Sequence, residues 1–262
     1  MLQAKPNSLL SERVALVTGA SQGIGAAIAD ALSQAGAAVL VNYYRSKDAA
    51  NAIVERIEAC GGRALAVQAD VRDGAAVRAM VARAVDEWGG IDVVVNNALH
   101  DYRFDPTTNP RFEDMEWPQF QAQIDGTVAG AVHTVQAALP SMRERGGGSV
   151  VNILTNLISN PVVQYHAYTT AKSALIGMSR NLAAELGPDG VRVNMLAGGL
   201  IMTTQASEPT TPEVQELVRS ITPLRRLGTP ADIAAAVVAL ASDLTCFVTG
   251  QFIAVDGGLT MP

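Results

Sequence analysis

Residues 164 to 172, QYHAYTTAK, contain side chains that could transfer a proton. Tyr168 and Lys172 are four residues apart, so on a helix they share one face. A tyrosine with its ordinary pKa of about 10 is a poor acid or base at neutral pH, and a neighbouring ammonium group lowers that pKa by favouring the phenolate. The spacing therefore predicts a Tyr168–Lys172 pair for general acid–base chemistry.

The other polar side chains near this pair are expected to have different roles. Tyr165 has Thr169 rather than a lysine four residues further on, so we expect it to line a substrate pocket or to pack against its neighbours. His166 is expected at a helix entry or on the surface, with a catalytic role as the alternative. No close ligand spacing joins His100, His133 and His166, so the sequence predicts no metal site.

A glycine-rich segment, TGASQGIG, lies between a predicted strand and a predicted helix. Its glycines, Gly19, Gly23 and Gly25, follow the pattern G-x-x-x-G-x-G. Glycine lets the backbone turn sharply and approach a ligand, while free N–H groups and the positive end of the helix dipole attract phosphate. We therefore expect this segment to hold a pyrophosphate, with a purely structural turn as the alternative.

The end of the second predicted strand, VNYYRSKD, indicates which dinucleotide would bind. An acidic residue about twenty positions after the glycines would bind the ribose 2′-hydroxyl of NAD. Here Arg45, Ser46 and Lys47 supply two cations and a hydroxyl, which suit a 2′-phosphate. We therefore expect NADPH or NADP rather than NADH. Asp48, the competing acidic residue, is expected to cap the next helix.

The elements that must position these residues alternate along the chain. Short β-branched runs predict strands, and Ala-rich periodic stretches predict the helices between them. The strand runs are residues 14–17, 37–42, 63–68, 91–96, 149–154, 191–196 and 252–255. This alternation predicts a single α/β domain with a doubly wound sheet of about seven parallel strands, right-handed crossovers and helices on both faces.

Composition limits the class of protein. The chain has 262 residues, of which 48% are hydrophobic, enough for one domain with a substantial core. A net charge of −6 gives no general attraction to nucleic acid or to an anionic membrane. No apolar run has the length of a spanning helix or a secretory signal. Cys60 and Cys246 lack a disulfide or zinc pattern, so we expect a reducing cytoplasm, with both thiols packed as small apolar groups.

Two irregular segments could shape a substrate site. The longer one, residues 198–229, is expected to form a lid with a short helix near 213–220; a surface insertion is the alternative. Asp101, Tyr102 and Arg103 follow the fourth predicted strand and are expected either to rim the substrate mouth or to lie in a solvated loop.

Four segments, in this order along the chain, are similar to motifs of the short-chain dehydrogenase/reductase family. They are TGASQGIG at the cofactor loop, ADV (69–71) at the adenine-side turn, NNA (96–98) at the fourth strand and YTTAK (168–172). The resemblance runs from about residue 13 to residue 258. Two further segments, PLRRLGTPADIA and VTGQFIAVDGG, are similar to the branch that contains the 3-oxoacyl-[acyl-carrier-protein] reductases. The resemblance implies one Rossmann-like oxidoreductase domain over residues 1–262.

The resemblance also implies a reaction and its residues. Hydride would move from the nicotinamide to a carbonyl carbon while Tyr168 gives a proton to the oxygen, and Lys172 would activate Tyr168 and hold the cofactor ribose. The expected cofactor-binding residues are Gly19, Ser21, Gln22, Gly23, Ile24, Gly25, Arg45, Ser46, Asp70, Val71, Asn97, Ala98, Tyr168, Lys172, Ile201 and Thr203. The expected substrate-lining residues are Leu99, Tyr165 and Gly199.

The expected partner is a small carbonyl substrate, first of all a 3-oxoacyl thioester carried on acyl-carrier protein or CoA. Sugar, steroid and secondary-metabolite ketones are alternatives, and a weakly catalytic NADPH-binding sensor or scaffold is an alternative of another class. Arg143, Arg145 and Arg192 are candidates for a basic patch that would face an acidic carrier protein, with scattered surface arginines as the equal alternative. The resemblance implies a homotetramer or homodimer, and the apolar helical stretches 121–138 and 168–186 would suit subunit packing.

Four positions depart from the family's pattern. Thr155 stands where the family has a catalytic serine; its hydroxyl can still donate to a substrate oxygen, with Ser159 as the fallback. Thr127 stands where an asparagine normally helps to hold a proton-relay water. Leu99 replaces a glycine beside the cofactor, and Gly198 replaces a proline, which should loosen the hinge of the lid.

Overall fold

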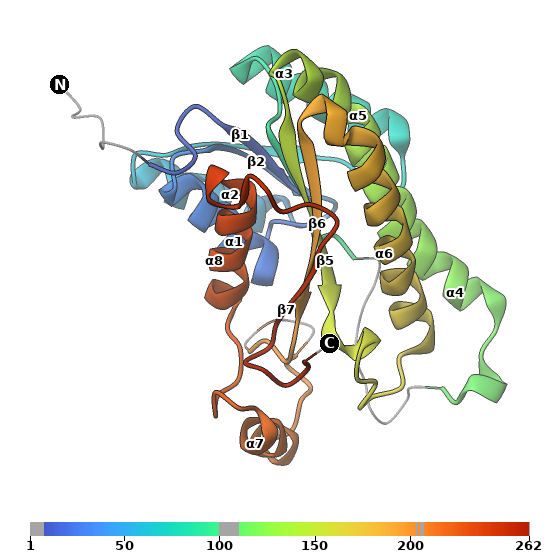
Figure 1. Cartoon of the computed structure of the whole chain (residues 1–262). Helices are drawn as coiled ribbons and strands as arrows, with labels where there is room; N and C mark the ends of the chain where they lie inside the picture. The colour runs from blue at the N-terminus through green and yellow to red at the C-terminus, as the bar shows by residue number, and fades with distance from the viewer. Residues whose placement is uncertain (1–7, 100–109, 203, 205–206, 262) are drawn as a thin grey trace.

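A parallel sheet of seven strands forms the centre of the structure (Figure 1), a computed structural model that describes residues 8–99, 110–202, 204 and 207–261. The strand order is β3-β2-β1-β4-β5-β6-β7. The strands are β1 (Val14–Val17), β2 (Ala38–Tyr43), β3 (Arg63–Gln68), β4 (Val93–Asn96), β5 (Gly148–Thr155), β6 (Val191–Gly198) and β7 (Phe252–Val255). All seven predicted strands are confirmed, within one or two residues at each end.

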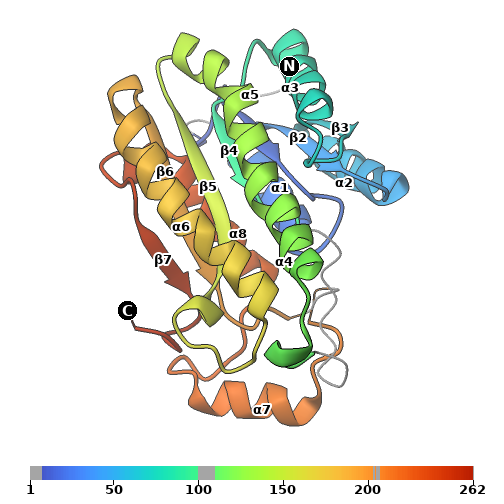
Figure 2. The ribbon, with the colours of Figure 1, turned by 90° about the vertical axis from the view of Figure 1, so that its right-hand side faces the viewer.

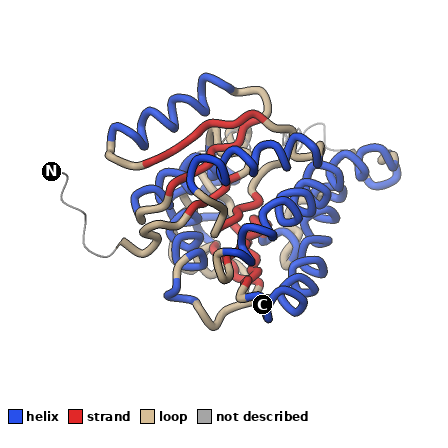
Figure 3. The backbone as a smooth tube through the Cα atoms, turned by 90° about the horizontal axis from the view of Figure 1, so that it is seen from above, coloured by secondary structure: helices blue, strands red, loops and turns tan. Residues whose placement is uncertain are grey.

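Eight α-helices accompany the sheet in the described ranges, and they cover both of its faces (Figures 2 and 3). They are α1 (Gly23–Gln34), α2 (Lys47–Ala59), α3 (Gly74–Trp88), α4 (Trp117–Ile124), α5 (Gly130–Glu144), α6 (His166–Leu186), α7 (Pro212–Ile221) and α8 (Pro230–Ala241). The predicted single α/β domain with a doubly wound sheet is therefore confirmed. None of these helices is long and apolar enough to cross a membrane.

The strand residues divide the core into two layers. In β1, Ala15 and Val17 pack with α1, α2 and α8 on one face, whereas Val14 and Leu16 pack with α3, α5 and α6 on the other. All four side chains are buried. Because both faces of this parallel sheet are covered, its inner strands read as continuous apolar runs rather than alternating ones.

A chain of hydrogen-bonded, buried polar side chains links α5 to α6 through the neighbouring strands β4 and β5. Thr134 of α5 donates to Asn96 Oδ1 (2.6 Å), Asn96 Nδ2 donates to Asn152 Oδ1 (2.8 Å), and Asn152 Nδ2 donates to Ser179 of α6 (2.7 Å). Asn96 and Asn152 are also register partners of β4 and β5. Since buried polar groups need partners, this chain fixes both helices and the strand register together.

The predicted basic patch of Arg143, Arg145 and Arg192 does not face the carboxyl ends of the strands, where a parallel sheet binds its ligands. All three lie near the amino ends of β5 and β6. Arg145 pairs with buried Asp92 (2.9 Å), and Arg143 pairs with Asp189 (2.7 Å). Arg192 donates to the Ser242 carbonyl and Thr245. These three cations thus have structural partners near the amino ends of the strands, at the edge of the sheet opposite its ligand-binding edge.

The two cysteines are exposed, contrary to the prediction that both would pack inside. Cys60 is the residue at which α2 ends, and Cys246 directly follows a short 3-10 turn, Asp243–Thr245. Both positions are ends of elements, where the chain turns at the surface instead of facing the sheet.

Helix α7 stands apart from the two layers, at the foot of the molecule in Figures 1 and 2. It confirms the short helix expected near residues 213–220. None of its residues is buried, and Val214, Leu217 and Ile221 expose large apolar side chains.

Candidate active site

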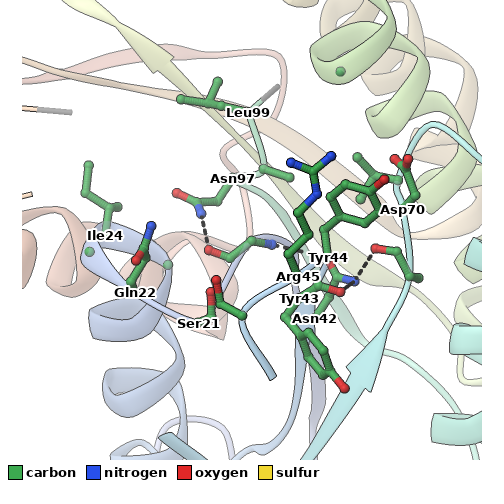
Figure 4. Close-up of a pocket in the computed structure, with 18 of the residues that line it drawn as sticks. Ser21, Gln22, Ile24, Asn42, Tyr43, Tyr44, Arg45, Asp70, Asn97 and Leu99 are labelled. Carbon is green, nitrogen blue, oxygen red and sulfur yellow. Dashed lines mark hydrogen bonds between the residues drawn. The ribbon is translucent and has the colours of Figure 1, made fainter. Parts of the chain in front are cut away.

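A cavity of about 400 Å³ opens at the carboxyl ends of β1, β2 and β4 (Figure 4). The strand order reverses here, because β2 and β3 lie on one side of β1 whereas β4, the next strand along the chain, lies on its other side. Parallel α/β sheets bind ligands in the crevice at such a reversal. The lining residues are Gly19, Ser21, Gln22, Gly23, Ile24, Gly25, Asn42, Tyr43, Tyr44, Arg45, Ser46, Ala69, Asp70, Val71, Arg72, Asn97, Ala98, Leu99, Gly126 and Thr204.

The glycine segment bends around one end of this cavity in a way that only glycine allows. Gly19 and Gly23 have φ angles of 61° and 56°, in the left-handed region. A Cβ atom on Gly25 would lie 2.4 Å from the Gly19 carbonyl oxygen and 2.6 Å from Asn97 Nδ2. Helix α1 starts at Gly23 with its N-terminus at the cavity, which provides the donors and dipole charge that suit a phosphate.

Two asparagines hold the glycine segment in place. Asn42 accepts from the Gly19 N–H (3.2 Å) and donates to the Ala69 carbonyl (3.1 Å). Asn97 donates to the carbonyls of Thr18 (2.9 Å) and Gly19 (3.2 Å). The sequence predicted Asn97 as a site residue but not Asn42. The only local indication of a role for Asn42 is that a polar residue stands at the end of an apolar strand.

The far end of the cavity is cationic. Tyr44, Arg45 and Ser46 line it, directly after β2. Arg45 lies against the ring of Tyr44, with 4.8 Å from its guanidinium carbon to the ring centre (Figure 4). Helix α2 begins at Lys47, so Ser46 is its N-cap residue and Asp48 lies inside its first turn. The expectation that Asp48 would be the cap is therefore wrong, because the chain turns into the helix two residues earlier.

The turn after β3 supplies the third wall. Asp70 and Val71 line the cavity as expected, and so does Arg72, which sequence reasoning missed. Arg72 forms a two-pronged ion pair with Asp70, at 3.0 Å from Nε to Oδ1 and 2.7 Å from Nη2 to Oδ2. His133 of α5 donates from Nδ1 to the Val71 carbonyl (2.9 Å), which ties this turn to the helix layer.

Lys172 and Tyr168 meet at the carboxyl end of β5. Both belong to α6, one turn apart, and the Lys172 amine lies 6.0 Å from the centre of the Tyr168 ring. Lys172 is 2% exposed and donates to the carbonyl of Ile153 in β5 (2.5 Å). Burial lowers the pKa of Lys172 to about 7. The predicted shared face is thus present, and the lysine can gain or lose a proton near neutral pH.

Tyr165 and His166 occupy the entry to the same helix. His166 is the first residue of α6, as expected, and packs edge-on against Phe112 with 5.3 Å between ring centres. Tyr165 precedes it and packs edge-on against Tyr168 with 6.2 Å between ring centres. Tyr165 therefore packs directly beside Tyr168.

Thr155 is the last residue of β5 and is 7% exposed. Its hydroxyl accepts a long hydrogen bond from the Leu157 N–H (3.3 Å). It lies two residues beyond Ile153, whose carbonyl binds Lys172. Ser159, the fallback, is exposed beyond a 3-10 turn over Asn156–Ile158, so the geometry favours Thr155.

Thr127 lies in a π-helical turn, Asp125–Ala129, between α4 and α5. Its side chain is 4% exposed, and its hydroxyl has no hydrogen-bond partner within the part of the chain that the structure describes. A cavity of about 10 Å³, lined by Thr127, Lys172 and Asn96 among others, lies beside it. That is close to the space one water molecule needs, and the side chains of Thr127 and Lys172 could bind such a water.

Several other expected positions do not line the main cavity or are not among the described residues. Ile201 is buried in the core, where its backbone bridges to Gly228, so its side chain does not line the cavity as expected. At Gly199 a Cβ would come within 2.8 Å of Asp256 Cβ, so close packing against Asp256 requires glycine there. Thr203 and the 101–103 segment lie outside the described residues.

Thr204, which sequence reasoning missed, lines the main cavity opposite Gly23. Leu99 lines it as well and is 38% exposed. Within the described ranges, no three His, Cys, Asp or Glu side chains gather closely enough to hold a metal ion.

Comparison with known proteins identifies relatives over nearly the whole chain. A family model described as enoyl-(acyl carrier protein) reductase matches residues 19–260. An uncharacterized oxidoreductase of Methylorubrum extorquens is 41% identical, covering 96% of this chain and 99% of the relative. The 3-oxoacyl-[acyl-carrier-protein] reductase FabG of Staphylococcus aureus is 37% identical, covering 94% and 98%.

A solved structure has the same fold. It is a 7 alpha-hydroxysteroid dehydrogenase in complex with NADH and 7-oxo glycochenodeoxycholic acid, 34% identical to this chain. The match covers 98% of each chain with a TM-score of 0.88. Relatives of similar identity thus act on quite different carbonyl compounds, one of them attached to a carrier protein and the other a steroid.

Proposed function

This chain belongs to the short-chain dehydrogenase/reductase family, and from that premise we propose that it reduces a 3-oxoacyl thioester with NADPH. As a member of this family it is an oxidoreductase that interconverts a carbonyl and an alcohol with a nicotinamide cofactor. The observation that carries the proposal is the buried Lys172 amine one helical turn from Tyr168, both beside the end of β5.

The described residues fit a nicotinamide dinucleotide. Because Gly25 has no Cβ, the Gly19 carbonyl can pack directly against it, and the N-terminus of α1 lies at the cavity there. We assign the pyrophosphate to Gly19, Ser21, Gln22, Gly23, Ile24 and Gly25, and the adenine side to Asp70 and Val71, with Asn97 and Ala98 between them. The cofactor supplies the hydride when it is bound.

The side chains around the carbonyl oxygen handle the proton. Tyr168 would give its proton to the carbonyl oxygen of the substrate, and the neighbouring Lys172, while it is protonated, would favour the phenolate that remains. Thr155 would donate a hydrogen bond to the same oxygen. Lys172 would also hold the cofactor ribose.

Thr127 takes the place of the relay asparagine in this proposal. Its unpartnered hydroxyl and the Lys172 amine line the same water-sized cavity, so a water held there by the Thr127 hydroxyl can pass a proton from the solvent to Lys172. Because the pKa of Lys172 is about 7, this amine can take up and release that proton at neutral pH.

The preference for NADPH rests on the end of β2. That strand ends in Asn42 and Tyr43, neither of which is acidic, and Arg45 and Ser46 follow at the cavity. A carboxylate is absent from the place where it would repel a 2′-phosphate, and a cation stands close by.

The substrate is the least constrained part of the proposal. The 37% identity to FabG and the C-terminal motifs support a thioester on acyl-carrier protein or CoA. A bulky apolar ketone is the second candidate, supported by the steroid dehydrogenase structure and by the exposed Val214, Leu217 and Ile221 of α7. In either case residues 198–229 form the lid, and Leu99, Tyr165 and Gly199 line the substrate side. We further propose a homotetramer or homodimer packed through α4, α5 and α6.

The test is the initial rate of NADPH oxidation with acetoacetyl-CoA, run beside Tyr168→Phe and the matched control Tyr165→Phe. Loss of the acid should lower the rate in Tyr168→Phe by about 100-fold or more, with Tyr165→Phe retaining most of it. Turnover of a 7-oxo bile acid but not of acetoacetyl-CoA would favour the steroid-like candidate. NADPH binding without turnover on any ketone would favour the sensor or scaffold alternative.

A further inference from the structure

Arg72 is the cavity-lining residue to which neither the motifs nor the comparisons assign a role. Its guanidinium carbon lies 5.8 Å from the centre of the Tyr44 ring, while that of Arg45 lies 4.8 Å from the same centre. All three residues line the main cavity. The Tyr44 ring therefore lies close to two guanidinium groups, one following β2 and one following β3, at one end of the cavity.

The position of Arg72 is fixed by Asp70. The pair uses Nε and Nη2 of Arg72, at 3.0 and 2.7 Å from the two carboxylate oxygens, and so orients the plane of the guanidinium. The third nitrogen, Nη1, is not engaged by that carboxylate. A guanidinium held in this way needs little reordering when an anion arrives, and it keeps donors for it.

The start of α2 adds to the attraction for an anion. Ser46, its N-cap residue, lines the cavity, and its hydroxyl makes no capping hydrogen bond with the helix. The positive end of the helix dipole therefore lies beside the two arginines. The nearby carboxylates have other partners or lie outside the cavity: Asp70 pairs with Arg72, Asp73 caps α3, Asp125 accepts from Gln121, and Asp48 does not line the cavity.

We propose that Arg72 and Arg45, spaced by Tyr44, form a two-cation clamp for the 2′-phosphate of NADPH, with Arg72 as a specificity residue. This inference rests on the proposed NADPH preference and extends it to a residue outside the β2 segment. The alternative role for Arg72 is structural: its pair with Asp70 would merely hold the turn after β3.

The test is direct titration of NADP and NAD binding, with 2′,5′-ADP and 5′-AMP as probes of the adenosine half alone. Arg72→Ala should weaken NADP and 2′,5′-ADP about tenfold or more, as expected for one lost charge-assisted contact, and should change NAD and 5′-AMP less than about twofold. Arg72→Lys should recover part of the loss, because it keeps the charge without the fork. Arg143→Ala, whose ion pair lies at the opposite edge of the sheet, is the matched control.

Equal weakening of NADP and NAD in Arg72→Ala would overturn the clamp in favour of the structural role. Unchanged binding of both would place Arg72 out of reach of the phosphate and overturn it too. In both cases an unmodified protein that still prefers NADP would leave the proposed function standing. An unmodified protein that prefers NAD would overturn the NADPH proposal and the clamp together.

Discussion

Replacing Lys172 with methionine measures how much the burial of this amine lowers the free energy of unfolding. Burial lowers the pKa of Lys172 from 10.5 to about 7. Between these two pH values the unfolded chain holds a proton that the folded chain has released, so the folded state loses stability as the pH falls through this window. Below pH 7 both states are protonated, so the loss of unfolding free energy caused by the buried amine, here called the penalty, stays constant. Methionine has a similar length and does not titrate.

The size of the effect follows from the pKa. Each pH unit in the window corresponds to about 1.4 kcal/mol, so the penalty is about 2 kcal/mol at pH 9 and about 3.4 kcal/mol at pH 8. Methionine also loses the hydrogen bond to the Ile153 carbonyl, an offset of about 1 kcal/mol that does not depend on pH. The expected signature is therefore a slope: the variant gains about 1.4 kcal/mol on the wild type for each unit by which the pH is lowered from 9 to 8.

Urea unfolding of the two proteins without cofactor, at several pH values in this range, measures the slope. Lys47→Met is the matched control, because Lys47 is exposed at the start of α2 and its removal takes a charge from the surface instead of the core. A pH-independent difference in unfolding free energy between Lys172→Met and the wild type would refute the reasoning. It would mean that the folded protein keeps the amine charged, for example through water in the adjoining cavity.

Two further substitutions address the cofactor cradle and the relay. Gly25→Ala should weaken NADPH binding in a fluorescence titration by about tenfold or more, because the added Cβ would collide with the Gly19 carbonyl. Gly177→Ala is the control and should bind NADPH normally, because a Cβ there meets nothing within 4 Å. Equal NADPH binding by the two variants would contradict the assignment of the glycine segment to the pyrophosphate. Thr127→Val should lower kcat about tenfold, because it removes the hydroxyl that holds the relay water. The midpoint of urea unfolding should stay unchanged or rise, since the lost hydroxyl has no hydrogen-bond partner among the described residues, and Thr127→Ser should keep the activity. An unchanged kcat in Thr127→Val would exclude a proton relay through this side chain.

The strands were predictable because both faces of the sheet are buried. A buried parallel strand needs apolar residues in succession, and glycine turns separate these runs from the helices. The structure extends two strands beyond their apolar runs, to Thr155 and Gly198. Those two ends carry polar or small residues because they leave the core and enter the site, so hydrophobicity alone stops short of them.

The parts of the site that depend on tertiary contacts were not predictable. Asn42 acts by reaching two segments, 23 and 27 residues away, and nothing in its local sequence indicates this. Arg72 becomes part of the cavity only because β2 and β3 are neighbours, which brings it to Tyr44. The same holds for the pairing of Arg143 with Asp189, which converts a free surface cation into a structural one.

The π-helical turn could not be read from the sequence either. Residues 121–138 have one continuous helical pattern, yet the helix widens at Asp125–Ala129. Such a turn places one extra residue in the helix and shifts the side chains that follow it. The burial of Thr127 beside Lys172 depends on this irregularity.

The buried chain from Thr134 through Asn96 and Asn152 to Ser179 has a consequence for how this protein can change over generations. Altering any one member leaves its neighbour with an unsatisfied polar group in the core, whereas altering several at once can replace the chain with apolar packing. A single substitution at any of these positions should therefore lower the free energy of unfolding, and selection for stability should oppose it. The four positions should change together or not at all, and substitutions among them should be strongly epistatic.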